Sequence, residues 1–332
     1  MIDRPHNRLT ADTRVDPVVS CAAHQPRFGA HLSIAGGLYR AFERAVEAGC
    51  DCLQVFVKNQ RQWRAAPIGS EALEQWRAAR EGSGIGPVVA HATYLINLAS
   101  AGGAVRRRSV AALLDELRRC EALGIDWLVV HPGAHLGAGE AAGCRRAADA
   151  LREIVDRFGD GRARPALEIT AGQGTCLGHR FEHLAEIIER CGRESGLGVC
   201  FDTCHALAAG YRFDDDASYA ATFDALDRAV GLSRLVCLHL NDSLRPFGSR
   251  RDRHTHVGKG HVGRGAFRRI VNDPRLTDRP MILETPKGTD PRGRDYDRVN
   301  LAGLRRMVRR RDVPDADGPR RAVRAGSFET GV

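Results

Sequence analysis

Short apolar runs alternate with helical patterns along the chain from residue 27 to residue 311. The runs are nearly continuous in hydrophobicity, which is typical of parallel strands buried on both faces of a sheet. Between them, apolar residues recur at spacings of three and four, and glycine follows several predicted helices. Eight runs are predicted to be strands: RFGAHLS, CLQVFVK, PVVAHA, WLVVHP, PALEIT, LGVCFDT, LVCLHLND and PMILETP.

Eight strand-then-helix units in about 285 residues match an α/β fold of the (β/α)8 TIM-barrel type in both length and count. No change in composition divides residues 27–311, so we expect one domain there. A doubly wound open sheet is the alternative. Residues 1–26 show no periodic pattern, and residues 312–332 are rich in Asp, Pro, Gly and Arg. We expect both ends to be disordered extensions.

The formal net charge is +9, and arginine supplies nearly all of the basic residues. An Arg bias can reflect genome composition, so charge alone does not decide whether the partner is a nucleic acid. No stretch approaches the roughly 18 apolar residues of a membrane span, and the N-terminus lacks the apolar core of a signal peptide. Ten cysteines without a C-x-x-C pair argue against a disulfide framework or a zinc ribbon. We expect a cytoplasmic monomer.

Ionisable residues end six consecutive predicted strands. One histidine near a strand end is usually an ordinary hydrogen-bonded residue, but six His, Asp and Glu in a row make chance implausible. Strand ends meet at the C-terminal mouth of a barrel, where active sites of this fold lie. Burying so many carboxylates there would be costly unless cations neutralised them. The six residues are His91, His131, Glu168, Asp202, His239 and Glu284.

Three further candidates bring the set to nine: His205, which follows Asp202 by three residues, and Asp252 and His254 in the loop FGSRRDRHTH. Nine ligands exceed the needs of one tetrahedral ion, so two or three ions sharing a carboxylate are implied. The mixed N and O donors favour Zn2+, with Mn2+ or Fe2+ as alternatives, over Mg2+ or Ca2+. Other candidates are interpreted as packing residues (Cys200, Cys204) or as surface or supporting residues (His135, His179, His183, His256, His261).

With these residues in place, the sequence resembles the endonuclease IV family of apurinic/apyrimidinic-site DNA repair nucleases over residues 27–305. The most specific matching stretches are KNQRQW, DTCHA and GSRRDRH, and GAHLSIAGGL, YLINLA, HPGAHL, AGQGTCLG, HLNDS and ILETP also match. The resemblance implies a (β/α)8 barrel with three zinc ions. One ion would be held by His91, His131 and Glu168, a second by Glu168, Asp202, His239 and Glu284, and the third by His205, Asp252 and His254.

The reaction implied by the resemblance is hydrolysis of the phosphodiester 5′ to an abasic site in double-stranded DNA, by attack of a metal-activated hydroxide. The products would be a 3′-hydroxyl and a 5′-deoxyribose phosphate, and Glu168, Asp202, His239 and Glu284 would be catalytic. Arg61 and Tyr94 would enter the base stack. From the residues alone, the favoured interpretation is that Trp63 and Tyr94 are core or lid aromatics and that the arginines lie in a solvated loop. The match to the family motif reverses that preference. The implied DNA contacts are Lys58, Asn59, Gln60, Arg61, Trp63, Tyr94, Leu95 and Arg253.

Three positions depart from the family pattern, and none of them is a predicted metal ligand: Ile169 where Asn is common, Leu244 where Lys is common, and Lys259 where an acid is common. The nearest alternative function is a metal-dependent sugar isomerase or epimerase on the same barrel, which would need one or two ions. A DNA-damage binder without chemistry would lack ligands, and none is lost here. GKGHVG matches a dinucleotide-binding pattern by chance, because no apolar strand precedes it.

Overall fold

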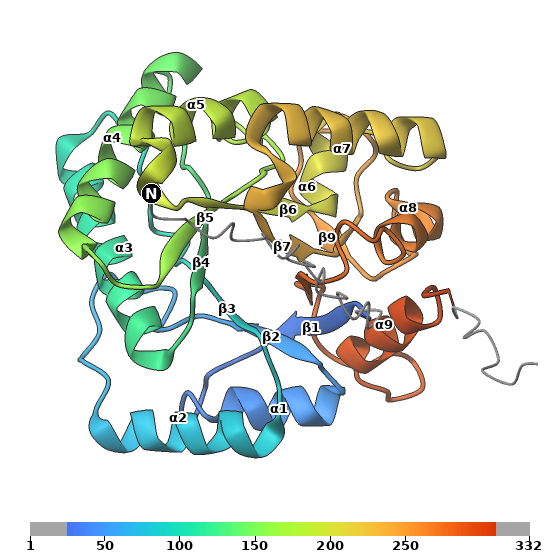
Figure 1. Cartoon of the computed structure of the whole chain (residues 1–332). Coiled ribbons are helices and arrows are strands. Elements are labelled where there is room, and N and C mark those ends of the chain that lie inside the picture. The colour runs from blue at the N-terminus through green and yellow to red at the C-terminus, as the bar shows by residue number, and fades with distance from the viewer. Residues whose placement is uncertain (1–24, 310–332) are drawn as a thin grey trace, which may run out of the picture.

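The computed structural model describes residues 25–309. Eight parallel strands close into a barrel in the order β1-β10-β7-β6-β5-β4-β3-β2, with helices around it (Figure 1). The predicted TIM barrel is confirmed, and closure excludes the open sheet. All eight predicted strands are present: β1 (Arg27–His31), β2 (Cys52–Val55), β3 (Val88–His91), β4 (Trp127–Val130), β5 (Arg164–Glu168), β6 (Gly198–Asp202), β7 (Leu235–His239) and β10 (Pro280–Leu283).

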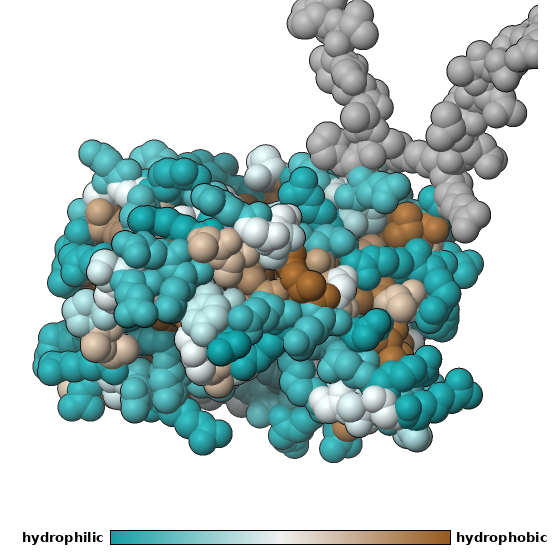
Figure 2. Space-filling model, turned by 90° about the horizontal axis from the view of Figure 1, so that it is seen from below, coloured by the Kyte–Doolittle hydropathy of each residue, from teal (hydrophilic) through white to brown (hydrophobic). Residues whose placement is uncertain are grey.

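The helices form where apolar residues recur at helical spacing. In α1 the buried residues Ala41, Phe42, Ala45 and Ala48 lie on one face, and the helix ends at Gly49, whose φ of 74° favours glycine. The other helices are α2 (Ser70–Ser83), α3 (Gly103–Leu123), α4 (Glu140–Phe158), α5 (Phe181–Cys191), α6 (Thr203–Ala209), α7 (Asp216–Val230), α8 (Gly263–Ile270) and α9 (Tyr296–Arg305), and α1 spans Arg40–Ala48. Figure 2 shows one outer face, where hydrophilic residues predominate and hydrophobic residues form small groups.

The interior of the barrel contains a layer of small and medium side chains that lies below the residues of the mouth. Side chains on a strand alternate between faces, so the residue two positions further on points the same way. Val89 and His91 therefore point to the same side of their strand, into the barrel. The same holds for Ala166 and Glu168 and for Cys237 and His239. The layer consists of Cys52, Val89, Val129, Ala166, Cys200, Cys237 and Ile282, all buried.

Two short strands outside the barrel hold the long loop that follows β7. β8 (Asp242–Ser243) pairs antiparallel with β9 (His254–Thr255), so both ends of the loop 244–253 are fixed. The buried carboxylate of Asp242 accepts hydrogen bonds from the backbone N–H groups of Gly258 and Val262, each at 2.8 Å. The sequence pattern did not predict this pair of strands.

The predicted disordered extensions lie outside the described residues, apart from Gln25 and Pro26. The proposed barrel boundary at residue 311 lies outside them too, and the last described helix ends at Arg305. None of the helices between residues 25 and 309 is both long and apolar enough to cross a membrane.

Candidate metal centre

Glu168, at the end of β5, is the centre of the cluster at the barrel mouth. Its carboxylate is fully buried, and each oxygen faces two imidazoles. Oε2 lies 3.1 Å from His91 Nε2 and 3.0 Å from His131 Nε2. Oε1 lies 3.0 Å from His239 Nδ1 and 3.2 Å from His205 Nδ1. Glu168 is therefore placed where one carboxylate can be shared between two ions.

The remaining candidates form the rest of the same cluster. Asp252 places Oδ2 3.2 Å from His205 Nε2 and Oδ1 3.4 Å from His254 Nε2. Asp202 Oδ2 lies 3.6 Å from His254 Nε2 and 3.8 Å from His239 Nδ1. Glu284 Oε2 lies 3.3 Å from His239 Nδ1. All nine candidate ligands thus meet at one end of the barrel.

The hydrogen bonds of four imidazoles test whether the cluster fits metal ions. A carbonyl oxygen can only accept, so the ring nitrogen facing it carries the proton and the other nitrogen keeps its lone pair when the ring is neutral. In each ring that second nitrogen faces a carboxylate, which is also an acceptor. The proton-bearing nitrogens are His91 Nδ1 toward the Ala92 carbonyl (2.7 Å), His205 Nδ1 toward Ile169 (2.9 Å), His254 Nδ1 toward Glu284 (3.2 Å) and His239 Nε2 toward the Gln54 side-chain oxygen (2.8 Å).

Two acceptors held face to face require a cation between them. Within the described residues, the buried Nε2 atoms of His205 and His254 make no hydrogen bond. A proton or a metal ion could supply the charge, but nitrogen and carboxylate donors at these positions are the ligand types of zinc. The donor set therefore fits divalent ions of that class.

The charges in the cluster depend on one another. Burial alone would raise the pKa of Glu168, but His239, His131 and His205 outweigh it and hold that pKa well below its usual range. Burial alone would lower the pKa of His239, but Glu284 and Glu168 raise it well above 6.5. Without other cations, these shifts favour an ionised Glu168 and a protonated His239. A metal ion would take the place of the proton that His239 gains.

Asp202 has a structural role that explains its spacing from His205. It is the N-cap of α6, and its Oδ1 accepts the backbone N–H of His205 at 2.7 Å. Its Oδ2 accepts a hydrogen bond from Asn241 Nδ2 at 2.6 Å. This capping hydrogen bond fixes Asp202 and His205 at the mouth, and the Asp202 carboxylate faces His254 and His239.

Three residues that the sequence analysis missed support the cluster. Gln54 Nε2 donates to Glu284 Oε1 at 2.6 Å and contacts His31 Nδ1 at 2.9 Å, which turns Gln54 Oε1 toward His239. Asn241 Oδ1 accepts the backbone N–H of Glu284 at 2.7 Å. His31 ends β1, so the strand-end rule used for the other residues would have found it.

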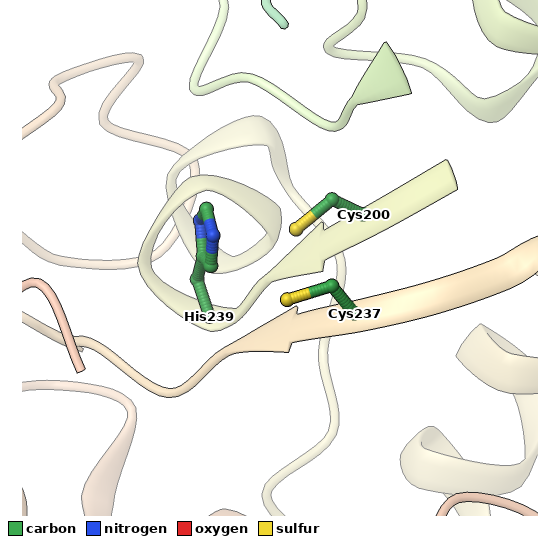
Figure 3. A group of neighbouring side chains, drawn as sticks. All are labelled: Cys200, Cys237 and His239. Carbon is green, nitrogen blue, oxygen red and sulfur yellow. The ribbon is translucent and has the colours of Figure 1, made fainter. Parts of the chain in front are cut away.

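The cysteines of β6 and β7 lie below the cluster. In Figure 3, Cys200 and Cys237 project from the two strands with their sulfur atoms toward each other, beside His239. They are register partners across the sheet and both are free thiols. Cys204 is also buried, and burial together with Asp202 raises its pKa to about 12. Cys200 and Cys204 therefore occupy packing positions.

The predicted DNA-contacting residues lie in loops around the mouth. Asn59, Arg61, Tyr94 and Arg253 are exposed, whereas Gln60, Trp63 and Leu95 are half-buried. Tyr94 is 68% exposed, and its ring stands edge-on to Phe56 with centroids 5.6 Å apart. Tyr94 also lines a cavity of about 190 Å³ together with His91, His131 and Asn97. The cavity adjoins two of the candidate ligands.

Lys58 is placed differently from the other residues of its loop. Its side chain is buried, with Nζ 3.2 Å from Glu116 Oε1 and 3.3 Å from Asp115 Oδ2, and it donates to the Trp63 carbonyl at 3.1 Å. Glu116 also accepts the N–H and the hydroxyl of Thr93, at 3.1 and 3.0 Å. Lys58 and Glu116 therefore tie the loop after β2 to the loop after β3, and Lys58 is not exposed for a DNA contact.

The three residues that depart from the family pattern differ in burial. Ile169 is fully buried, and its backbone carbonyl accepts from His205, so only its side chain differs from the usual polar residue. Leu244 is 56% exposed in the loop between β8 and β9. Lys259 is exposed outside that loop. None of the three side chains is a member of the cluster.

Comparisons with known proteins agree with the fold. A family model described as "Xylose isomerase-like TIM barrel" matches residues 42–306. A "Probable endonuclease 4" of Chloroflexus aurantiacus is 52% identical over 283 residues, covering 85% of this chain and 98% of that protein. The crystal structure of endonuclease IV from Thermus thermophilus has a TM-score of 0.74 and 43% identity, covering 85% of this chain and 98% of that one. A D-tagatose 3-epimerase-like protein (TM-score 0.66, 20% identity, 85% and 96% covered) shares the fold.

The chain is thus a TIM-barrel protein of the xylose isomerase-like class, with a carboxylate and imidazole cluster at the barrel mouth. Within that class it belongs to the endonuclease IV family, whose members are hydrolases of the nuclease type.

Proposed function

We propose that the protein is a zinc-dependent DNA repair enzyme that hydrolyses the phosphodiester 5′ to an abasic site in double-stranded DNA. The products would be a 3′-hydroxyl and a 5′-deoxyribose phosphate. The observation that carries the proposal is the placement of buried Glu168 between four imidazoles, within a cluster that keeps all nine predicted ligands. Membership of the endonuclease IV family supports the choice of substrate.

In this proposal the cluster holds three ions. His91, His131 and Glu168 would hold one; Glu168, Asp202, His239 and Glu284 a second; and His205, Asp252 and His254 the third. Their ligand atoms lie close enough for two of these groups to be complete as three-residue sites. Bound divalent ions would acidify water and neutralise charge on a phosphate.

The protein's own residues would supply orientation. Backbone carbonyls hold the rings of His91, His205 and His254 in one tautomer, so their free nitrogens are aimed before any ion arrives. Gln54 does the same for His239, and Asn241 fixes the carboxylate of Asp202. A site arranged in advance needs little rearrangement during the reaction.

The exposed loops would contact DNA. Asn59, Gln60, Arg61 and Arg253 carry donors that suit backbone phosphates and base edges. Trp63, Tyr94 and Leu95 offer apolar surface, and exposed Tyr94 beside the mouth cavity suits a wedge that replaces an unstacked base. Lys58 would contribute indirectly, by holding in place the loop that carries Arg61.

The proposal is tested on a labelled duplex with one abasic-site analogue. We expect a single cut on the 5′ side of the analogue and a 3′-end that a DNA polymerase extends without further processing. The matched undamaged duplex should remain intact, because it cannot readily place a base-free sugar at the mouth.

A cut on the 3′ side of the analogue would contradict the proposal. So would intact abasic DNA combined with interconversion of ketose sugars, which would instead establish the epimerase alternative.

Replacing Tyr94 with alanine tests the wedge. We expect kcat/KM on abasic DNA to fall about 10- to 100-fold, because stacking contributes about 1–3 kcal/mol per base. Steady-state incision measures the effect, and Tyr94→Phe, which keeps the ring, should stay close to the wild type. Equal rates for the alanine and phenylalanine variants would exclude the wedge.

A further inference from the structure

A second group of metal-ligating side chains lies outside the mouth, between the beginnings of α4 and α5. Glu140 begins α4, and His179 and His183 lie just before and within the first turn of α5. Oε1 of Glu140 is 3.4 Å from His179 Nε2, and Oε2 is 3.2 Å from His183 Nε2. The ligand atoms all lie within 4.8 Å of one another.

The two histidines were expected at the surface or as supporting residues, but both are buried. His179 is 6% exposed and His183 is 4% exposed. Their rings meet edge to face with centroids 4.7 Å apart. Glu140 retains 43% of its side-chain exposure, so water can reach one side of the group.

The hydrogen bond of His179 matches the pattern at the mouth. Its Nδ1 lies 3.0 Å from the carbonyl of Cys176, which can only accept, so Nδ1 carries the proton. The neutral ring then points the lone pair of Nε2 at the carboxylate of Glu140, as His91, His205 and His254 do toward their carboxylates. A cation between the buried lone pair of His179 Nε2 and the carboxylate of Glu140 would satisfy both acceptors.

His183 can join the same ion by a change of tautomer. Its Nδ1 now accepts the backbone N–H of Gly178 over a long 3.4 Å, while Nε2 lies against Glu140 Oε2. Moving the ring proton to Nδ1 would give up that long hydrogen bond and free Nε2. Two imidazoles, one carboxylate and a water form a four-coordinate set typical of zinc.

We propose that Glu140, His179 and His183 bind one zinc ion, separate from the cluster at the mouth. The ion would join the start of α4 to the segment between β5 and α5. That segment also contains Gln173, whose Oε1 accepts the backbone N–H of Asp252 at 3.2 Å. The site would thus steady a neighbour of the catalytic cluster without touching substrate.

Nearby arginines lower the zinc affinity that we expect for this site. Arg180 Nη1 lies 3.9 Å from Glu140 Oε2, and the positive charge of Arg250 also acts on His179. Both charges oppose a cation, and only one of the three proposed ligands is a carboxylate. This site should therefore fill at higher free zinc than the mouth does.

The test is the number of zinc ions per chain in the untagged full-length protein. Wild type, His179→Leu, Glu140→Gln and the control His261→Ala are dialysed against a series of zinc buffers and analysed by atomic spectroscopy. We expect wild type and His261→Ala to bind one more ion than the other two variants. Because the result is a difference, it does not depend on how many ions the mouth holds.

Glu140→Gln keeps a hydrogen-bond acceptor for His183, so it carries the test if His179→Leu does not fold. Incision of abasic DNA in saturating zinc should be unchanged in both variants. Equal zinc content in all four proteins would overturn the proposal. So would the absence of an anomalous zinc peak between the three side chains in zinc-soaked wild-type crystals.

Discussion

Replacement of Glu168 with glutamine is expected to lower kcat for incision of abasic DNA on the order of a thousandfold, since metal activation is worth several kcal/mol of barrier and each 1.4 kcal/mol is about tenfold. The amide keeps the size of the side chain but turns one of two buried acceptor oxygens into a donor. That donor would face imidazole nitrogens at about 3 Å. Two ions would lose a shared ligand at once.

Zinc content distinguishes this explanation from a change in DNA binding. The Glu168→Gln protein should retain fewer ions than wild type while binding abasic DNA with similar affinity, because its exposed loops are untouched. Glu43→Gln, at the surface of α1, is the matched control and should behave as wild type. Full activity of the Glu168→Gln variant would contradict a shared carboxylate.

The second large effect concerns stability. Replacing Lys58 with methionine is expected to reduce the free energy of unfolding by about 3–5 kcal/mol, because it leaves a buried carboxylate without its partner. Glu116 is fully buried, and burial already raises its pKa despite Lys58. Equilibrium unfolding in urea measures the loss.

Two further variants identify the cause of the lost stability in Lys58→Met. Lys259→Met removes an exposed lysine and should change the free energy of unfolding by less than about 0.5 kcal/mol. The double variant Lys58→Met with Glu116→Gln should recover part of the loss, because no buried charge remains unpaired. Equal stability of Lys58→Met and Lys259→Met would show that the pair does not hold the two loops.

The sequence was sufficient to predict the barrel and to select the cluster. Parallel strands buried on both faces read as continuous apolar runs, and in a barrel their ends have only one place to meet. The two-residue period then fixes which side chain faces inward at each end, as for Ala166 and Glu168. Strand hydrophobicity and the two-residue period depend only on neighbouring residues, so both can be predicted from a single sequence.

Other features depend on partners that local patterns do not reveal. Gln54 lies inside an apolar run, and only the closed barrel shows that it faces His239 and Glu284. The burial of Lys58 depends on Glu116, which comes from α3 in a later unit. The spacing of His179 and His183 is visible in the sequence, but their shared partner Glu140 begins a different helix.

The most direct test of metal-dependent incision at the barrel mouth is cutting of abasic duplex DNA before chelation, after removal of metal, and after zinc is restored. We expect rapid cutting by the native protein, none above background by the folded metal-free protein, and recovery with zinc. Undiminished cutting by protein shown to contain no metal would contradict metal dependence.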